Sequence, residues 1–280
     1  MTEIRTMSSM PKRTLPFSVN QYLCPLTMRP TDFLDRIESF GFQGAGITQG
    51  ALQSLGASEM AAELQRRNLQ VTSLNSAGFF LQEGEAALVQ AERNLGLLKQ
   101  SNQLGQSRLN VIVGGSSTLP LNLARELAAE RLEAFARQAS DFGVQLMVEP
   151  LHHLNVRTKS CFNSISQLEP LFERIPGLTL NADLFHLWWD PDLDRLLRGG
   201  SLPLGLLQIC DVSMNDAEPV PRRVPLGEGC IPWIDHVRAV RMAFPSVSIE
   251  LELFADQLPG RALEEILAGS ASALKTLVEK

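Results

Sequence analysis

The chain has 280 residues, a formal charge of −6, and 44% hydrophobic against 20% charged residues, a balance typical of a folded globular protein rather than a disordered one. Because the charge is negative and lysine and arginine form no run, we expect a small-molecule substrate and no nucleic-acid partner. The sequence contains no continuous segment of the roughly 18 apolar residues that a membrane span requires, so no membrane association is expected.

Residues 1–15 carry charges and serines but no apolar core, so we expect a flexible tail and no signal peptide. The four cysteines are widely separated and include no C-x-x-C pair, which argues against a zinc knuckle or a disulfide framework. They are predicted to be reduced, buried thiols in a cytoplasmic protein. The sequence leaves the oligomeric state open, a homo-oligomer included.

From residue 16 to 280, short apolar runs alternate with longer amphipathic segments, the pattern of βα units. Strands are predicted at Phe17–Leu23, Gly44–Thr48, Gln70–Asn75, Leu109–Val113, Val144–Glu149, Leu178–Asp183, Leu204–Asp211 and Val247–Phe254. Helices are predicted at Thr31–Phe40, Ala57–Arg67, Glu83–Leu104, Leu121–Phe142, Ser164–Arg174, Leu193–Leu197, Ile234–Ala243 and Ala262–Val278. Eight such units in one domain predict an α/β fold, a single (β/α)8 TIM barrel.

The least regular segment is Val212–Ile231, which holds three prolines and two glycines. A loop of this length in a compact domain usually has a function, such as covering a site.

Oxygen-bearing side chains mark the ends of the last four predicted strands. Glu149 closes the fifth strand, Asp183 the sixth, Gln208 lies in the seventh, and Glu250 and Glu252 lie in the eighth. In a barrel these ends converge on one mouth, where three unpaired carboxylates would repel one another. A divalent cation is the natural counter-charge, and oxygen ligands favour Mn²⁺ or Mg²⁺, with Co²⁺ as a substitute.

The sequence therefore predicts one metal ion held by Glu149, Asp183, Gln208 and Glu252. Glu250 shares the face of Glu252, because side chains two apart on a strand point the same way, and it is expected one layer deeper. The alternative is that these acids pair with arginines around the rim.

Five ordered blocks, V-E-P-L-H-H, N-A-D-L-F-H-L-W-W-D-P, Q-I-C-D, R-R-V-P-L-G-E-G-C-I-P-W and E-L-E-L-F, resemble the sugar phosphate isomerase/epimerase family. That family has the xylose isomerase-like TIM barrel, and the resemblance runs from about Phe17 to the end of the chain. It implies that Glu149, Asp183 and Glu252 hold a divalent metal. The family's ligand on the seventh strand is commonly a histidine three residues before an aspartate. Here Gln208 stands before Asp211, a departure that dehydratases among the relatives share.

The resemblance also implies roles for neighbouring residues. His186 would contact a substrate oxygen beside the metal, and Arg223 would orient a substrate hydroxyl or carboxylate. His152 follows Glu149 by three residues and either points into the same mouth to bind substrate or turns to solvent. Three further side chains are candidates for a substrate wall, with packing as the alternative for the tryptophans: Trp188, Trp189 and Asn20.

The implied activity is that of a metal-dependent isomerase or epimerase of a sugar, a sugar phosphate or a keto acid. It would work through a metal-stabilised enediolate, with Glu149 and Glu252 as catalytic base and acid. The alternative is a metal-dependent dehydratase of a cyclic polyol or a 3-dehydroshikimate-like acid, because the same site can expel a β-hydroxyl.

Two further function classes are less compatible with the sequence. Related apurinic endonucleases need a multi-zinc site rich in histidine, and this acidic chain has four histidines in all. A barrel used for binding alone would hold no metal, so metal analysis distinguishes it.

Overall fold

The computed structural model describes residues 15–105, 108–200, 202–215 and 218–278. Eight parallel strands close into a barrel in the order β1-β10-β7-β6-β5-β4-β3-β2, so the first and last strands of the chain are neighbours. The barrel strands are β1 (Leu15–Asn20), β2 (Phe42–Thr48), β3 (Gln70–Gly78), β4 (Leu109–Ile112), β5 (Leu146–Val148), β6 (Thr179–Asp183), β7 (Leu204–Ile209) and β10 (Ser248–Leu251). The predicted eight-stranded barrel is confirmed.

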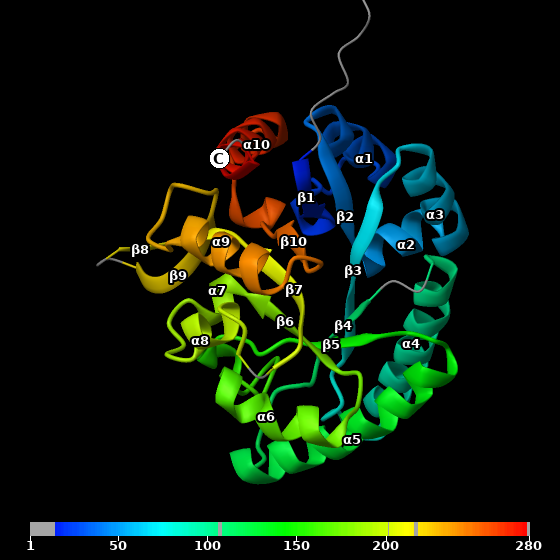
Figure 1. The fold of residues 1–280 in the computed structure, drawn as a ribbon. Helices are drawn as coiled ribbons and strands as arrows, with labels where there is room; N and C mark the ends of the chain where they lie inside the picture. The colour runs from blue at the N-terminus through cyan, green and yellow to red at the C-terminus, as the bar shows by residue number, and fades with distance from the viewer. Residues whose placement is uncertain (1–14, 106–107, 201, 216–217, 279–280) are drawn as a thin grey trace, which may run out of the picture.

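Helices surround this ring of strands (Figure 1). They are α1 (Pro30–Ser39), α2 (Gln49–Leu55), α3 (Ala57–Arg66), α4 (Gly84–Gln103), α5 (Leu121–Asp141), α6 (Ile165–Arg174), α7 (Leu184–Leu187), α8 (Leu193–Leu197), α9 (Trp233–Ala243) and α10 (Leu263–Val278). Each of the eight predicted helices is present within a few residues. The short helices α2 and α7 were not predicted, because one or two turns leave too little sequence for a helical period to register.

Two-sided burial explains the apolar composition of the strands. All five residues of β6 are buried, since one face meets the barrel interior and the other meets the helices. Each helix buries one apolar face against the strands. In α1 the buried residues are Phe33, Leu34 and Ile37. It ends before Gly41, whose φ of 90° lies in the left-handed region that glycine adopts freely.

A two-stranded hairpin stands outside the closed ring. Strands β8 (Asp211–Asn215) and β9 (Glu218–Val224) pair antiparallel, with Val212 opposite Arg223. The expectation of an irregular loop over Val212–Ile231 was therefore wrong for its first part, and the seventh barrel strand ends at Ile209 rather than at Asp211. Prolines do not prevent this pairing, because a two-stranded ribbon has outer edges where no backbone N–H is needed.

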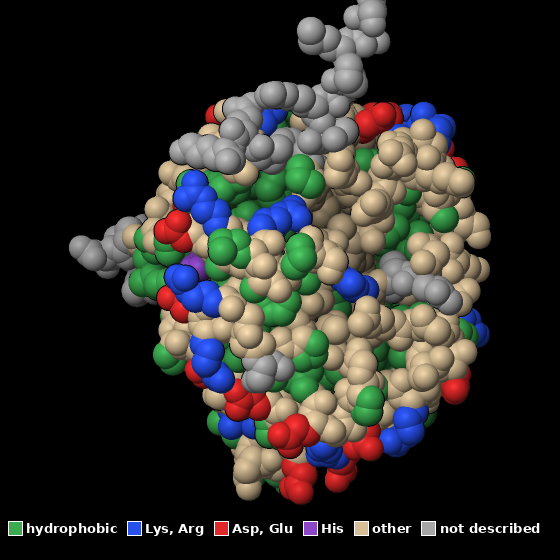
Figure 2. Space-filling model, viewed as in Figure 1, with side chains coloured by type: hydrophobic (Ala, Val, Ile, Leu, Met, Phe, Trp, Pro, Cys, Tyr) green, Lys and Arg blue, Asp and Glu red, His purple; other side chains and the backbone are tan. Residues whose placement is uncertain are grey.

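The tail predicted for residues 1–15 lies outside the described residues, apart from Leu15, which begins β1. The helices of the described chain include none with the length and apolarity that crossing a bilayer demands. On the face shown in Figure 2, acidic side chains lie mainly along the edge of the molecule.

The cysteines are free thiols in different environments. Cys161 and Cys210 are buried, Cys24 is partly buried and Cys230 is exposed. The prediction of four buried thiols was wrong for Cys230, which lies in the turn that follows the hairpin rather than in a barrel strand, and only partly right for Cys24.

Candidate metal centre and active site

Strand register places three of the predicted site residues side by side. Glu250 of β10 pairs with Gln208 of β7, which pairs with Asp183 of β6. All three are fully buried, and residues paired in register point to the same side of a sheet, here the barrel interior. Glu149 and Glu252 directly follow β5 and β10 at the same mouth and are each 4% exposed.

Glu250 lies in a pocket of neutral hydrogen-bond donors. Its carboxylate packs directly on Gly46, where a Cβ atom would come within 2.5 Å of a carboxylate oxygen. Four side chains donate to it: Asn20, Thr72, Ser73 and Gln208. These donors enclose Glu250, whereas Glu252, two residues further along the chain, contacts Gln208 and Arg223.

The amide of Gln208 bridges the two glutamates. Its Nε2 lies 2.9 Å from Oε1 of Glu250 and 2.9 Å from Oε1 of Glu252, while its oxygen accepts a hydrogen bond from Asn181 at 2.8 Å. Two carboxylates can only accept, so it is the nitrogen of this amide that faces them.

Arg223 of β9 enters the carboxylate cluster and is 3% exposed. Its Nη1 lies 3.1 Å from Oδ1 of Asp183, and its Nη2 contacts the other Asp183 oxygen and lies 2.9 Å from Oε2 of Glu252. The guanidinium also lies 4.4 Å from the ring centroid of Phe185 and 5.1 Å from that of Phe254. Arg223 thus joins the acids of two strands that β7 separates.

His186 of α7 points its Nε2 at two carboxylates without bonding to either. The distances are 3.8 Å to Oε1 of Glu149 and 3.6 Å to Oδ2 of Asp183. Burial lowers the pKa of His186 to about 3, so the ring is neutral at neutral pH. The backbone N–H of His152 donates to Nδ1 at 3.1 Å, and this leaves the ring proton on Nε2. His186 therefore presents an N–H donor to the space between the acids.

The acids differ in how readily they ionise. Burial, reinforced by the charge of Asp183, raises the pKa of Glu149. Burial also raises the pKa of Glu252, even though Arg223 opposes the shift. Burial opposes the ionisation of Asp183 as well, yet the charge and hydrogen bonds of Arg223 contribute to lowering the pKa of that carboxyl. Without a cation, two of these carboxyls thus favour their protonated form, and a cation bound beside them would favour the ionised form instead.

This cluster fits a divalent cation on charge and on donor type. The cluster holds four buried carboxyls and the single positive charge of Arg223. The carboxyls are those of Glu149, Asp183, Glu250 and Glu252. Ligand atoms of Glu149, Asp183 and His186 lie within 4.8 Å of one another. Because the Nε2 of His186 carries a proton, the carboxylates are the groups in this trio with lone pairs for a metal.

The remaining sequence candidates are placed as follows. His152 is buried, and its ring lies 5.8 Å from that of Trp189 and 4.3 Å from that of His153. Trp188 packs against the core, whereas Trp189 is 36% exposed. The Asn20 amide lies 2.8 Å from Glu250 and 3.4 Å from Glu252, so it is committed to the acids.

Sequence reasoning missed two asparagines that shape the site. Asn110 of β4 donates to Glu149 and to Asn75 of β3, the latter at 3.1 Å. Asn181 of β6 holds the oxygen of Gln208. The available signal was an amide within an otherwise apolar strand, as in L-N-V-I and T-L-N-A-D.

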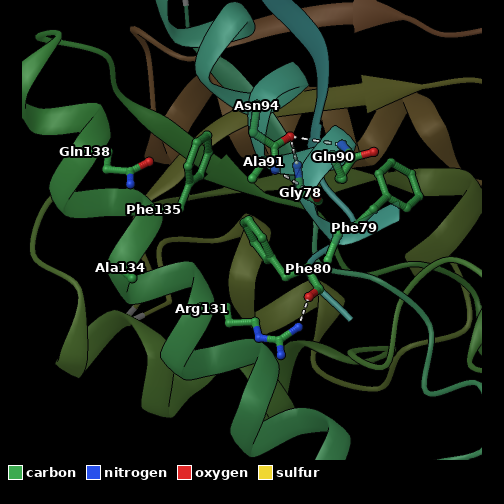
Figure 3. A pocket seen from close by; sticks show the side chains of 11 residues that line it. Gly78, Phe79, Phe80, Gln90, Ala91, Asn94, Arg131, Ala134, Phe135 and Gln138 are labelled. Carbon is green, nitrogen blue, oxygen red and sulfur yellow. Dashed lines mark hydrogen bonds between the residues drawn. The ribbon is translucent and has the colours of Figure 1, made fainter. Parts of the chain in front are cut away.

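Several cavities lie around the barrel, and two of them bear on the site. One of about 480 Å³ lies at the mouth, lined by the segments that follow β1, β2 and β3. Another of about 270 Å³ lies between α4 and α5, where Arg131 donates to the carbonyl of Phe80 beside the ring of Phe135 (Figure 3). The second cavity is lined by helix residues and by the Gly78–Phe80 segment, and the four clustered acids line neither of these two cavities.

Comparisons with known proteins agree with the architecture. A family model described as xylose isomerase-like TIM barrel matches residues 34–277, and no curated protein sequence matches the chain. The solved structure of protein SMc04130 from Sinorhizobium meliloti is 23% identical with a TM-score of 0.82, covering 94% of this chain and 98% of its own. A zinc-bound IolI protein is 16% identical, with a TM-score of 0.77 and the same coverages. A D-psicose 3-epimerase from Clostridium cellulolyticum is 14% identical, with a TM-score of 0.76 and coverages of 94% and 98%.

Proposed function

The chain belongs to the xylose isomerase-like TIM barrel family, and on that premise we propose that it is a divalent-metal-dependent isomerase or epimerase of a sugar or a related hydroxy-carbonyl compound. One observation carries the proposal: the buried carboxyls of Glu149, Asp183 and Glu252 gather at one barrel mouth, with Arg223 in contact with Asp183 and Glu252. Carboxylates gathered in this way suit the binding of a divalent cation and the removal and return of a proton on a bound substrate.

The proposed ligands of the metal are Glu149, Asp183, Gln208 and Glu252. Carboxylate and amide oxygens favour Mn²⁺ or Mg²⁺, with Co²⁺ as a substitute, and the likeness to a zinc-bound protein supports a divalent ion in general. Gln208 would join this set after its amide turns its oxygen toward the cluster. When bound, the ion would stabilise the negative charge of an enediolate.

Side chains of the protein would transfer the proton and orient the substrate. One of Glu149 and Glu252 removes the proton from the carbon beside the carbonyl, and the other returns a proton, to the opposite face in epimerisation or to the neighbouring carbon in isomerisation. His186 donates its Nε2–H to a substrate oxygen, held in that tautomer by the His152 amide. Arg223 orients a second substrate hydroxyl from the hairpin side.

A dehydratase is the second candidate, and Gln208 is the observation that favours it. The family resemblance implies that some relatives, dehydratases among them, share this departure from the usual histidine. The same proton removal, followed by loss of a β-hydroxyl instead of proton return, would release water and give an unsaturated carbonyl product.

The test combines metal analysis with isotope exchange. Protein dialysed against Mn²⁺ should hold about one equivalent, and turnover in D₂O should place deuterium on the carbon beside the carbonyl, because the abstracted proton exchanges with solvent. Asp183→Asn should lower both metal content and rate. His186→Ala should keep the metal and lose about a hundredfold in rate through poorer positioning.

Asp235→Asn is the matched control, because this α9 side chain is 73% exposed and lies outside the cluster. Well under one equivalent of metal, together with turnover that EDTA leaves unchanged, would refute the proposed function. Release of water with an ultraviolet-absorbing product would favour the dehydratase.

A further inference from the structure

The cavity of about 270 Å³ between α4 and α5 lies outside the carboxylate cluster. Residues of both helices line it, and the Gly78–Phe80 segment at the end of β3 forms its third wall (Figure 3). Its volume is just below the range of about 300–1,000 Å³ typical of ligand sites, so it suits a small molecule.

Side chains of α4 fix the wall that follows β3. Asn94 is buried, its Oδ1 accepts from the Gly78 N–H at 3.0 Å, and its Nδ2 donates to the Gly78 carbonyl at 2.9 Å. Gln90 donates to the same Asn94 oxygen at 3.1 Å. A Cβ atom on Gly78 would come within 2.1 Å of the Ile112 carbonyl oxygen, so this wall packs directly on β4. The wall is therefore held in place from both sides.

Two phenylalanines give the cavity an apolar surface. The ring centroids of Phe80 and Phe135 lie 5.6 Å apart, and the rings are tilted by 57° to each other. Small side chains beside them leave this surface uncovered, namely those of Ala87, Ala91 and Ala134. Aromatic rings that face open space favour a ligand with an apolar body.

Arg131 of α5 brings a positive charge to the same cavity. Its Nη1 donates to the carbonyl of Phe80, and the described lining of the cavity includes no aspartate or glutamate. Arg137 of the same helix, by contrast, pairs with Glu133 at 2.9 Å. In Figure 3 Arg131 lies at one end of the view and Gln90 with the Asn94 amide at the other, with the two rings between them. The cavity thus offers a guanidinium beside an apolar surface.

We infer that this cavity binds a small monocarboxylate with an apolar body. The carboxylate would accept hydrogen bonds from the remaining N–H groups of Arg131, whose planar guanidinium matches two oxygens of one acceptor. The apolar body would lie on the rings of Phe80 and Phe135. One guanidinium balances one negative charge, so a monocarboxylate fits better than a phosphate dianion. Because none of the clustered acids lines this cavity, the inference does not depend on the proposed function.

The test is a binding measurement with a charged and a neutral probe of the same shape. The full-length protein is titrated with phenylacetate and with 2-phenylacetamide, and ligand-observed saturation-transfer NMR follows binding. Phenylacetate should bind about fivefold more tightly than the amide, as expected for a partly exposed ion pair with arginine. This ratio should shrink in 1 M NaCl, because salt screens such a pair.

Two variants assign the binding to this cavity. Arg131→Gln should weaken phenylacetate binding to the level of the amide, while Arg131→Lys, which keeps the charge, should recover part of it. Ala91→Phe should fill the cavity and abolish binding of both probes. Ala91 is exposed, so the fold should persist, as circular dichroism would check. The matched controls lie on the same helices outside the lining: Arg137→Gln, at a side chain 69% exposed, and Leu88→Phe, at a residue 73% exposed.

A probe bound at the barrel mouth has to be distinguished, because Phe79 lines both this cavity and the mouth cavity of about 480 Å³. Gly50→Phe narrows the mouth cavity, since the space around the Gly50 Cβ position is open, and it should leave phenylacetate binding unchanged. Loss of binding in Gly50→Phe would overturn the inference, and so would binding that survives Ala91→Phe. Equal binding of acid and amide, or no binding of phenylacetate at all, would overturn it as well.

Discussion

Arg223 supplies the positive charge that reduces the repulsion among the clustered carboxylates when no metal is bound. Its guanidinium contacts Asp183 and Glu252, both buried, and removing one partner of a buried ion pair typically costs about 3–5 kcal/mol. Arg223→Gln should therefore lower the melting temperature of EDTA-treated protein much more than that of Mn²⁺-loaded protein, because the ion would then balance the acids. Differential scanning calorimetry in both conditions measures the difference.

Arg238→Gln is the control for that variant, because Arg238 is 51% exposed and lies 3.6 Å from Asp235 at the surface. Equal losses with and without Mn²⁺ would show that Arg223 and the metal do not share the same carboxylates. Arg223→Lys, which keeps the charge, should recover much of the metal-free stability.

Cys24 offers a pH-dependent test of the mouth cavity. Burial, with a smaller contribution from Asp32, raises the pKa of this thiol to about 11, so the thiol is protonated at neutral pH. The thiolate is the reactive form, so alkylation of Cys24 by iodoacetamide should accelerate about tenfold per pH unit between pH 8 and pH 10. Mass spectrometry of the labelled peptide follows the rate.

A ketose that binds in the cavity should slow this labelling, because Cys24 lies in its wall. Cys230, exposed in the turn after the hairpin, serves as the internal comparison and should not be protected. Labelling of Cys24 at one rate across this pH range would contradict the raised pKa.

At this scale the sequence reveals the acids but not their partners. Glu149 and Asp183 can be identified because each ends an apolar run, and Glu252 because it lies at the end of the last predicted strand. Two of their partners could not be identified, because they come from distant strands: Asn110 is 39 residues from Glu149, and Asn181 is 27 residues from Gln208. Those distant neighbours also decide whether the oxygen or the nitrogen of an amide faces the cluster. A local sequence pattern therefore cannot predict the orientation of the amide.

The hairpin β8–β9 owes its position to Asp211. One oxygen of this carboxylate accepts from the N–H groups of Val212 and Ile231, both at 2.9 Å, and the other accepts from Gly227 at 3.1 Å. Asp211→Ala should free these amides and loosen the segment that carries Arg223. Limited trypsin digestion should then cut near Arg222 and Arg223 at least several-fold faster, while the barrel remains folded by circular dichroism.

Asp256→Ala is a suitable control, since Asp256 lies in the short helix after β10 and has no role at the hairpin. Unchanged digestion of Asp211→Ala would mean that the strand pairing alone holds the hairpin. The sequence did not predict this element, because its prolines and glycines suggested a loop and its pairing depends on Asp211 gathering amides up to 20 residues away.

For the whole molecule, a metal that binds the folded barrel alone should stabilise it by mass action. At a free Mn²⁺ concentration one hundred times the dissociation constant, the gain is about 2.7 kcal/mol in the free energy of unfolding. The melting temperature should therefore rise with Mn²⁺ concentration, and Glu149→Gln should flatten that rise. A melting temperature independent of Mn²⁺ in the unaltered protein would contradict a metal site in the barrel.

Barrel closure was the most predictable feature, because eight alternations of strand and helix have few other compact solutions. The exact strand ends were less predictable. The fifth strand was expected from Val144 to Glu149 and spans Leu146–Val148, since Val144 and Glu149 are buried like the strand residues although they lie outside it.

The pairing of β1 with β10 also bears on the order in which the barrel forms during synthesis. Ribosomes make the chain from its N-terminus, so Asn20 and Ser73 emerge long before the strand that carries Glu250. Until that last strand inserts between β1 and β7, neither Glu250 nor Glu252 has its partners, and four acids cannot gather in one place. The barrel must therefore be completed after synthesis of nearly the whole chain, and the proposed metal would be captured by the finished protein rather than by the nascent one.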